Sequence, residues 1–114
     1  LSFIYDQNGL WNNHIPNNLK LFVFNNQGGG IFKIISGPKN TPFLEEYFET
    51  KHELSLKSIA QTHHLNYHCA KNEKEAEQII PSVLESNQFE IVEFFTGNVE
   101  NEKILNDYFS VIKK

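Results

Sequence analysis

The sequence predicts an α/β protein, a three-layer α/β/α sandwich built around a parallel sheet. Short apolar runs of strand length alternate along the chain with longer stretches of helical periodicity. Strands that alternate with helices pair in parallel through right-handed crossovers, which places helices on both faces of the sheet. No linker, internal repeat or low-complexity segment divides the sequence. We therefore expect the sandwich to form one domain.

Three segments have the length and composition of strands, and the first of them also sets the position of the candidate site. Its apolar residues would lie on both faces, as in the middle of a parallel sheet. The predicted strands are Leu19–Phe24, Leu65–Cys69 and Phe89–Phe95.

Helices are predicted from apolar spacing and from capping residues at their starts. The predicted helices are Ser2–Trp11, a short one over Ile31–Ile35, Phe43–Thr50, Leu54–His64, Asn72–Ser86, and a last one that begins at Val99 or Asn101. Ser2, Ser55 and Asn72 are the expected caps. Pro81 should kink the fifth helix or restart it. Residues 36–42 read as a loop. The last helix should turn these apolar side chains inward: Ile104, Leu105, Tyr108, Phe109 and Ile112.

Composition narrows the possible functions. The 114 residues include ten phenylalanines and are 39% hydrophobic, which favours a folded core. A net charge of −4 without a basic cluster argues against binding to nucleic acid or to anionic membranes. The single cysteine, Cys69, cannot form an internal disulfide and is expected to be a buried thiol in a reducing cytoplasm. We expect no transmembrane segment, because no apolar run approaches the ~20 residues that span a bilayer.

The most informative stretch is Leu19–Ile35. Its apolar strand ends in Asn25 and Asn26, three glycines follow at positions 28–30, and a second apolar segment begins at Ile31. Open α/β sheets bind ligands at the carboxyl ends of their strands. A glycine loop there lets backbone N–H groups approach a phosphate closely. The alternative for this stretch is an ordinary turn, since asparagine and glycine are common in turns.

An apolar strand that closes in Asn-Asn resembles the end of the thiamine diphosphate (ThDP) motif, which runs from Gly-Asp to Asn-Asn. The resemblance implies that Asn26 and the carbonyl of Gly28 help to hold the Mg²⁺ that carries the diphosphate. Amide and carbonyl oxygens suit this hard cation. The Gly-Asp half of the motif would lie just before Leu1.

One ThDP family shares both ends of the motif with this chain. The opening Leu1-Ser2-Phe3-Ile4-Tyr5-Asp6 and the segment Gly28-Gly29-Gly30-Ile31-Phe32 resemble the menaquinone-pathway enzyme 2-succinyl-5-enolpyruvyl-6-hydroxy-3-cyclohexene-1-carboxylate synthase. The resemblance continues to the C-terminus. It implies that residues 1–114 are the C-terminal part of a truncated ThDP-binding fold, the pyrophosphate-binding domain, without the upstream Gly-Asp and first strands.

The resemblance also implies roles for individual residues. The cofactor-binding positions are Leu1, Ser2, Asn26, Gly28, Gly29 and Ile31, with Asn26 and Gly28 also binding the metal. Ile31, Phe32 and Ile35 would form a catalytic apolar wall beside the thiazolium, where a low dielectric favours loss of charge during decarboxylation. Each of these three could equally be a core residue. We expect Lys33 to be solvated, because the apolar residues on either side of it face the other way.

The implied activity is that of the whole parent enzyme, a carbon–carbon bond-forming transferase of the cytoplasm. Its substrates would be 2-oxoglutarate and isochorismate, and its site would need a pyrimidine-binding domain and a second subunit of a homo-oligomer. We expect the 114-residue chain alone to be inactive and to bind ThDP and Mg²⁺ weakly or not at all, because the metal-binding aspartate is missing.

Two alternatives remain open at this point, and a third, zinc binding, is disfavoured. A pyruvate-using relative, of the acetolactate synthase or pyruvate oxidase type, would share the Asn-Asn loop. A non-enzymatic α/β module could use the glycine loop to hold a phosphate or a partner. The five histidines could bind zinc, but they lack a second cysteine or a metal-binding spacing, and they read better as surface or hydrogen-bonded side chains.

Overall fold

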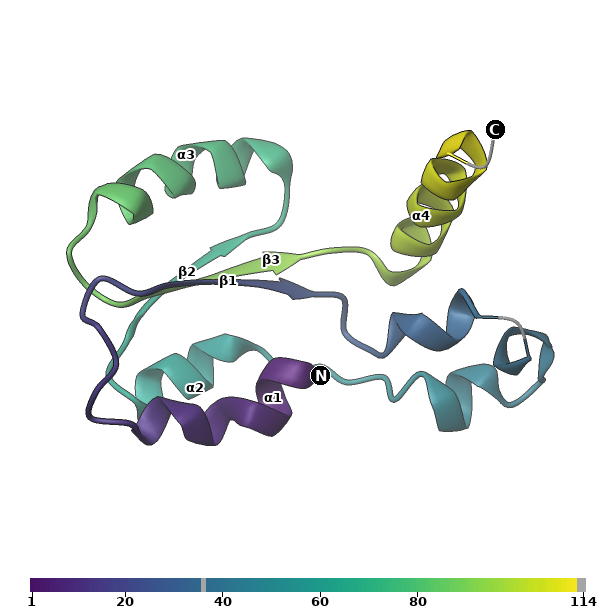
Figure 1. The fold of residues 1–114 in the computed structure, drawn as a ribbon, viewed down its shortest axis with the longest axis horizontal. Coiled ribbons are helices and arrows are strands. Elements are labelled where there is room, and N and C mark those ends of the chain that lie inside the picture. Colours follow the sequence, from purple (N-terminus) through teal and green to yellow (C-terminus); the bar gives the residue numbers. More distant parts are fainter. Residues whose placement is uncertain (36, 113–114) are drawn as a thin grey trace. The chain divides into compact units, whose positions relative to one another are not determined.

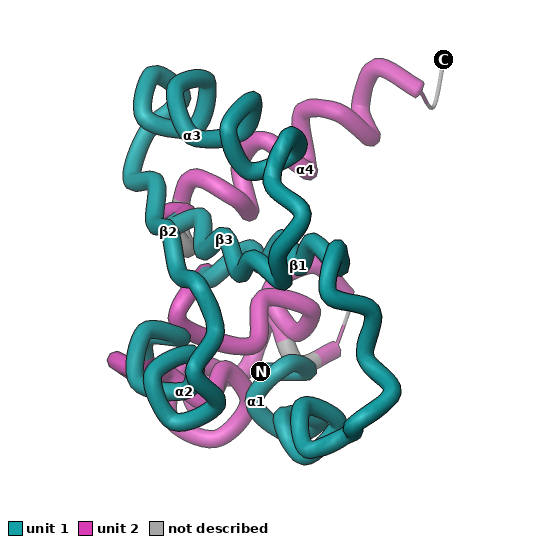
Figure 2. The backbone as a smooth tube through the Cα atoms, turned by 90° about the vertical axis from the view of Figure 1, so that its left-hand side faces the viewer, with its two compact units in different colours: residues 1–25, 55–95 teal, residues 26–54, 96–114 magenta. Residues whose placement is uncertain are grey.

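The computed structural model describes residues 1–35 and 37–112, apart from the side chains of Pro38, Asn98 and Val99. Their contacts divide the chain into two compact units (Figure 2). Unit 1 comprises residues 1–25 and 55–95, and unit 2 comprises residues 26–54 and 96–114. The assignment of residues 1–114 to part of one ThDP-binding domain stays a prediction.

The sheet of unit 1 has three parallel strands, as the alternation of strands and helices predicts. The strands are β1 (Lys20–Asn25), β2 (Asn66–Ala70) and β3 (Glu90–Phe95), in the order β1-β3-β2. Ile91 in the central strand is level with Leu21 of β1 and with Tyr67 of β2. Each strand lies within one residue of its predicted bounds, and all three end at the same edge of the sheet.

Helices cover both faces of this sheet, which confirms the α/β/α sandwich for unit 1 (Figure 1). On one face lie α1 (Ser2–Asp6), its 3₁₀ continuation η1 (Gln7–Trp11), and α2 (Leu56–Thr62). On the other lies α3 (Glu73–Glu85). Successive residues of β3 alternate between the two faces. The core on the α2 side of the sheet is the buried cluster Leu56, Ala60, Phe89 and Ile91.

The capping predictions have mixed outcomes. Ser55 and Asn72 are the N-caps of α2 and α3, and their side-chain oxygens accept from the backbone N–H groups of Lys57 and Glu75. The prediction for Ser2 is wrong, because Leu1 is the cap residue of α1 and makes no side-chain capping bond. The predicted helix over residues 2–11 changes to 3₁₀ geometry at Gln7, two residues before Gly9, a residue that weakens helices.

Pro81 lies inside α3, which runs from Glu73 to Glu85 without restarting at the proline. Val83, in the second half of this helix, is only 1% exposed. Packing of its side chain against the rest of unit 1 holds that half of the helix in place. Tertiary packing therefore overrides the helix-breaking tendency of proline at this position.

Unit 2 consists of short helical turns and one long helix. The short elements are η2 (Gly30–Lys33), η3 (Pro38–Asn40) and the π-helical η4 (Leu44–Phe48). They confirm short helices near Ile31 and Phe43, and η3 occupies part of the predicted loop, whose Ser36 lies outside the described residues. The long element is α4 (Asn98–Ile112), which contacts η2.

The predicted inward face of α4 is mostly wrong. Ile104, Tyr108, Phe109 and Ile112 are all more than 40% exposed, whereas Leu105 is half-buried. Periodicity identifies an apolar face, but it does not supply the layer that would cover that face. Among the described residues, no helix combines the length and apolar character needed to cross a bilayer.

Candidate functional site

The loop that follows β1 begins with the predicted metal-binding residues. Asn26 is half-buried and Gly28 is buried. The Gly28 N–H group points to the Asn26 side-chain oxygen over a long 3.4 Å. Between them, Gln27 takes the left-handed conformation with φ of 58°, so a residue other than glycine makes the sharp turn here. The turn places the Asn26 amide and the Gly28 backbone on one short loop.

A second segment of unit 2 holds this loop from the side. The Gly29 N–H group donates to the Glu49 carbonyl at 2.5 Å, and the His52 N–H group donates to the Gln27 carbonyl at 3.0 Å. These two bonds flank Gly28 on either side. The predicted metal-binding carbonyl therefore belongs to a residue whose two neighbours are anchored to residues 49–52.

Lys33 is buried, which makes its predicted exposure to solvent wrong. The residue is 7% exposed, and its Nζ lies 3.0 Å from Oε1 of Glu49, a fully buried carboxylate. Ile31 and Ile35 are instead 57% and 41% exposed. The reversal arises because residues 30–33 form a 3₁₀ helix with three residues per turn, and because Glu49 provides a partner that the local sequence does not reveal.

A cavity of about 280 Å³ opens beside this loop within unit 2. It is lined by Asn26, Gly30, Ile31, Lys33, Ile34, Asn101, Glu102 and Leu105. The structure thus brings together Asn26 and Ile31 of the predicted site. Phe32 packs instead against Phe48, with ring centroids 5.4 Å apart. Sequence reasoning missed the three lining residues from α4, because nothing local connects that helix to a loop some 70 positions earlier.

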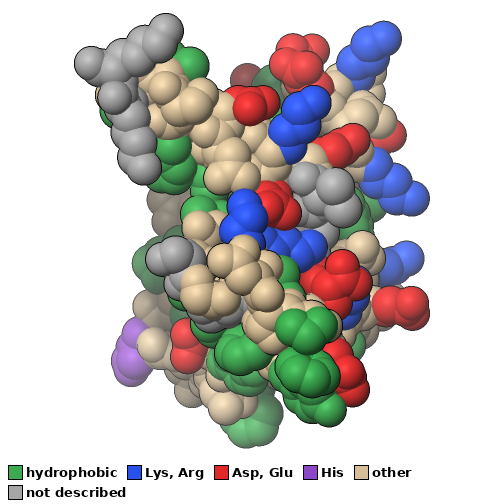
Figure 3. Space-filling view, turned by 90° about the vertical axis from the view of Figure 1, so that its right-hand side faces the viewer, with side chains coloured by type: hydrophobic (Ala, Val, Ile, Leu, Met, Phe, Trp, Pro, Cys, Tyr) green, Lys and Arg blue, Asp and Glu red, His purple; other side chains and the backbone are tan. Residues whose placement is uncertain are grey.

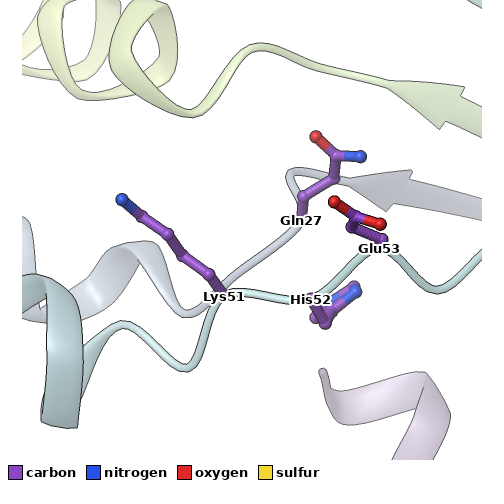
Figure 4. A pocket seen from close by; sticks show the side chains of 4 residues that line it. All are labelled: Gln27, Lys51, His52 and Glu53. Atoms are coloured by element: carbon purple, nitrogen blue, oxygen red, sulfur yellow. The ribbon is translucent and has the colours of Figure 1, made fainter.

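A second cavity, of about 380 Å³, is lined by Gln27, Lys51, His52 and Glu53 (Figure 4). The side chains of Gln27 and Glu53 lie near each other, and Lys51 extends away from the other three (Figure 4). Nδ1 of His52 accepts from the Leu54 N–H group at 3.3 Å. The described residues that line this cavity include charges of both signs, Lys51 and Glu53.

The donors on the loop fit part of a Mg²⁺ site. Asn26 supplies an amide oxygen and Gly28 a carbonyl oxygen, both hard neutral ligands of the kind this ion accepts. Across residues 1–35 and 37–112, no group of three or more histidine, cysteine, aspartate or glutamate side chains could hold a metal ion. An octahedral ion needs more ligands than these two, so the loop fits as one side of a site with further ligands from elsewhere.

Unit 1 contains the remaining predicted residues and a cluster that sequence reasoning missed. Leu1 is half-buried and its carbonyl accepts from the N–H groups of Ile4 and Tyr5, while Ser2 is exposed. The missed group, which we call the strand-end cluster, surrounds Glu93 near the carboxyl end of β3 and consists of Asn25, Ser55, Leu56, Tyr67 and Glu93.

Glu93 is fully buried and each of its carboxylate oxygens accepts several hydrogen bonds. Oε1 accepts from Nδ2 of Asn25 at 2.7 Å, and Oε2 accepts from Oγ of Ser55 at 2.8 Å and from the Tyr67 hydroxyl at 2.5 Å. The Leu56 N–H group lies 3.2 Å from both oxygens. Burial raises the pKa of Tyr67, and its bond to Glu93 raises it further, so the phenol stays neutral and donates.

Comparison with known proteins shows which family of proteins this chain is related to. No family model matches it. It is 41% identical over 114 residues to the 2-succinyl-5-enolpyruvyl-6-hydroxy-3-cyclohexene-1-carboxylate synthase of Christiangramia forsetii, covering 99% of this chain and 20% of that protein. The chain is a homologue of part of this synthase. The synthases of Flavobacterium psychrophilum and Cytophaga hutchinsonii are each 39% identical, over 96% and 100% of the chain and 20% and 21% of their own lengths.

The chain therefore spans about one fifth of the length of the curated synthases it matches. The similarity runs through both units, so it includes the asparagine–glycine loop and the strand that carries Glu93. The predicted family resemblance is confirmed. The roles of individual site residues stay predictions.

Proposed function

We propose that the chain is the C-terminal part of a ThDP pyrophosphate-binding domain in a synthase of menaquinone biosynthesis. The complete enzyme would remove carbon dioxide from 2-oxoglutarate and add the succinyl carbanion equivalent to isochorismate. The observation that carries this proposal is the loop from Asn26 to Gly29, which contains two candidate oxygen donors and lies beside a cavity. The 114-residue chain around this loop matches a curated synthase over 99% of the chain.

Asn26 and Gly28 would hold Mg²⁺ through the amide and carbonyl oxygens. The backbone from Gly29 to Ile31 would approach the diphosphate, since residues without bulky side chains allow close contact. The family resemblance also gives Leu1 and Ser2 a cofactor-binding role, as the residues that follow Gly-Asp in the motif. Bound ThDP supplies the electron sink that decarboxylation of a 2-oxo acid requires.

The apolar wall would come from η2 and the residues after it. Ile31 and Ile35 are exposed in this chain, so their side chains are accessible to a ligand, and Phe48 holds the ring of Phe32 in place. Such a wall would exclude water from the reacting centre and favour the change from a charged carboxylate adduct to a neutral product. Lys33 has no role in binding a substrate carboxylate in this proposal, because Glu49 already neutralises it.

The exposed apolar residues support a place in a larger protein. Phe24 and Trp11 are 72% and 75% exposed, and Tyr47 is 68% exposed. Figure 3 shows hydrophobic side chains gathered on the lower part of one face, beside charged ones. Contiguous exposed apolar surface commonly marks an interaction site. We propose that the other domains of the synthase and a second subunit cover such surfaces.

The assignment is tested with the complete synthase chain that carries these residues, in the presence of ThDP and Mg²⁺. We expect carbon dioxide release from 2-oxoglutarate and an isochorismate-dependent product. Preference for pyruvate would move the protein to the acetolactate synthase or pyruvate oxidase type. Absence of turnover and of ThDP binding would contradict the proposal and leave a non-enzymatic α/β module.

The residue-level prediction is that Asn26→Ala weakens Mg²⁺ binding in that complete chain and abolishes turnover. Removing one of the metal's oxygen ligands costs affinity directly, and misplacement of the cofactor then lowers the rate. Calorimetric titration of Mg²⁺ in the presence of ThDP measures the first effect. Asn12→Ala, in an exposed connection, is the matched control and should bind Mg²⁺ normally.

A further inference from the structure

Glu93 is an unusual residue to find at the centre of a small sheet. It lies on the same face of β3 as the core residue Ile91, where an apolar side chain would pack without an electrostatic penalty. A buried carboxylate costs several kcal/mol unless hydrogen bonds replace its hydration. Four groups donate those bonds to Glu93, and they come from β1, from the start of α2 and from β2.

The two oxygens of Glu93 have different partners. Oε2 binds Ser55 and Tyr67, which join α2 and β2 to the central strand. Oε1 binds the side chain of Asn25, the last residue of β1. Asn25 is 5% exposed, so its amide group has little freedom to turn elsewhere. The bond to Oε1 therefore fixes the orientation of the residue at which β1 ends.

We propose that Glu93 is a positioning residue for the asparagine pair: it holds Asn25, and through the peptide bond it sets where Asn26 begins the metal-binding loop. The inference rests on the proposed function, in which Asn26 is a Mg²⁺ ligand. It also gives the first asparagine a role, since Asn25 would be the side chain that ties the loop to the sheet. A shift of about 1 Å in such an element is enough to lower a rate or an affinity substantially.

The test uses Mg²⁺ titrations of the complete synthase with ThDP present, followed by calorimetry. Asn25→Leu keeps the volume of the side chain and removes its N–H donors. Glu93→Met removes the acceptor. Each variant should raise the Mg²⁺ concentration for half-saturation by ~10-fold or more, the size typical of residues that orient a ligand. The double variant should be no weaker than either single one, because both remove the same bond.

Tyr67→Phe is the matched control. It removes a donor to Oε2 of the same carboxylate and leaves the bond between Oε1 and Asn25 in place. We expect a lower melting temperature with Mg²⁺ affinity within ~2-fold of the parent, because the bond that orients Asn25 is not the one that this variant removes. Glu93→Gln should also keep the affinity, since its amide oxygen can accept from Asn25 while Ser55 and Tyr67 accept from its N–H₂ group.

The outcomes separate this inference from the proposed function. If Asn26→Ala weakens Mg²⁺ binding but Asn25→Leu does not, Glu93 is a structural residue only and the inference is wrong. The same conclusion follows if Tyr67→Phe weakens binding as much as Asn25→Leu. If Asn26→Ala itself has no effect on Mg²⁺ binding, the proposed function fails and the inference fails with it.

Discussion

At the scale of single residues, Lys33 and Glu49 show how a buried charge can be stable. Their side chains are 9% and 0% exposed, and the charged atoms are 3.0 Å apart. Nζ of Lys51 lies 3.7 Å from the other oxygen of Glu49. The Glu49 backbone carbonyl also accepts from Gly29, so the partner of Lys33 belongs to the segment that anchors the glycine loop.

We predict that Lys33→Met lowers the free energy of unfolding by about 3 kcal/mol, because Glu49 would lose its nearest counter-charge inside the protein. The double variant Lys33→Met, Glu49→Leu should recover most of that loss, since a buried ion pair contributes little over an apolar pair. Denaturant unfolding of the complete synthase chain measures the free energy of unfolding of the single and the double variant.

The control for this pair is Lys39→Met, which removes the exposed partner of Glu102. A surface ion pair contributes ~0–1 kcal/mol, so this variant should be close to the parent. If the single variant Lys33→Met were as stable as Lys39→Met, the buried pair would not contribute as the structure indicates.

At the scale of elements, Glu90 joins three parts of unit 1. Its carboxylate binds Nε2 of His68 on β2 at 2.9 Å and Oγ of Ser86 after α3 at 2.6 Å, and Asn66 donates at 3.3 Å. Burial acts to raise the pKa of Glu90, but the bonds from Ser86 and His68 act against it, and the net shift is below the ordinary value. The hydrogen bonds around Glu90 therefore favour the ionised form of its carboxylate.

Because the pKa of Glu90 is lower in the folded state than in the unfolded state, its ionised carboxylate stabilises the fold at every pH above the unfolded pKa. This stabilisation is lost as pH falls through the folded pKa. We predict that the complete chain loses stability below about pH 4.5, and that Glu90→Gln makes the acid side of the stability profile shallower. Glu77→Gln, on the exposed face of α3, is the control and should keep the parent slope. Equal slopes for Glu90→Gln and the parent would contradict the assignment.

The proline in α3 leads to a second prediction for an element. Pro81 cannot donate a hydrogen bond to the preceding turn, which costs about 3 kcal/mol in a helix interior. Its rigidity restricts the unfolded chain and offsets up to about 1 kcal/mol of this. Pro81→Ala should therefore raise the free energy of unfolding by about 2 kcal/mol. Thermal and denaturant unfolding test it, with Lys74→Ala as an exposed control in the same helix. A loss of stability would mean that the proline fits the helix better than alanine does.

At the scale of the whole molecule, the described residues supply only part of the Mg²⁺ site that the proposed function requires. Its loop contributes two neutral oxygen donors, and the described residues contain no group of three or more histidine, cysteine, aspartate or glutamate side chains that could hold a metal ion. The curated synthases it matches are about five times longer. A divalent ion held by two neutral ligands would lose little of its hydration.

We therefore predict that the 114-residue chain alone shows no calorimetric binding of Mg²⁺ with ThDP, whereas the complete synthase does. Circular dichroism of the isolated chain should establish its helix and strand content before the titration. Tight binding by a folded 114-residue chain would show that the loop suffices without the upstream aspartate, contrary to this prediction.

Sequence patterns predicted the strands well, whereas the roles of the site residues stay predictions. The strand Leu19–Phe24 and the caps Ser55 and Asn72 depend on neighbours within a few positions, so local chemistry was enough. Asn26 and Ile31 were predicted from the family motif, and both line one cavity. Asn101 and Glu102 were missed because long-range packing brings α4 to that cavity, and no local pattern records it.

The α/β class, the alternation of strands and helices, and the relationship to the synthases could be predicted from the amino-acid sequence, because they follow from periodicity and from a motif in neighbouring residues. The burial of Lys33 against Glu49, and the bonds by which Glu93 joins Asn25 to α2 and β2, are visible only in the folded chain. One cause accounts for both. The cost of burying a charge depends on partners 16 and 68 positions away, and only the folded chain brings those partners into hydrogen-bond distance.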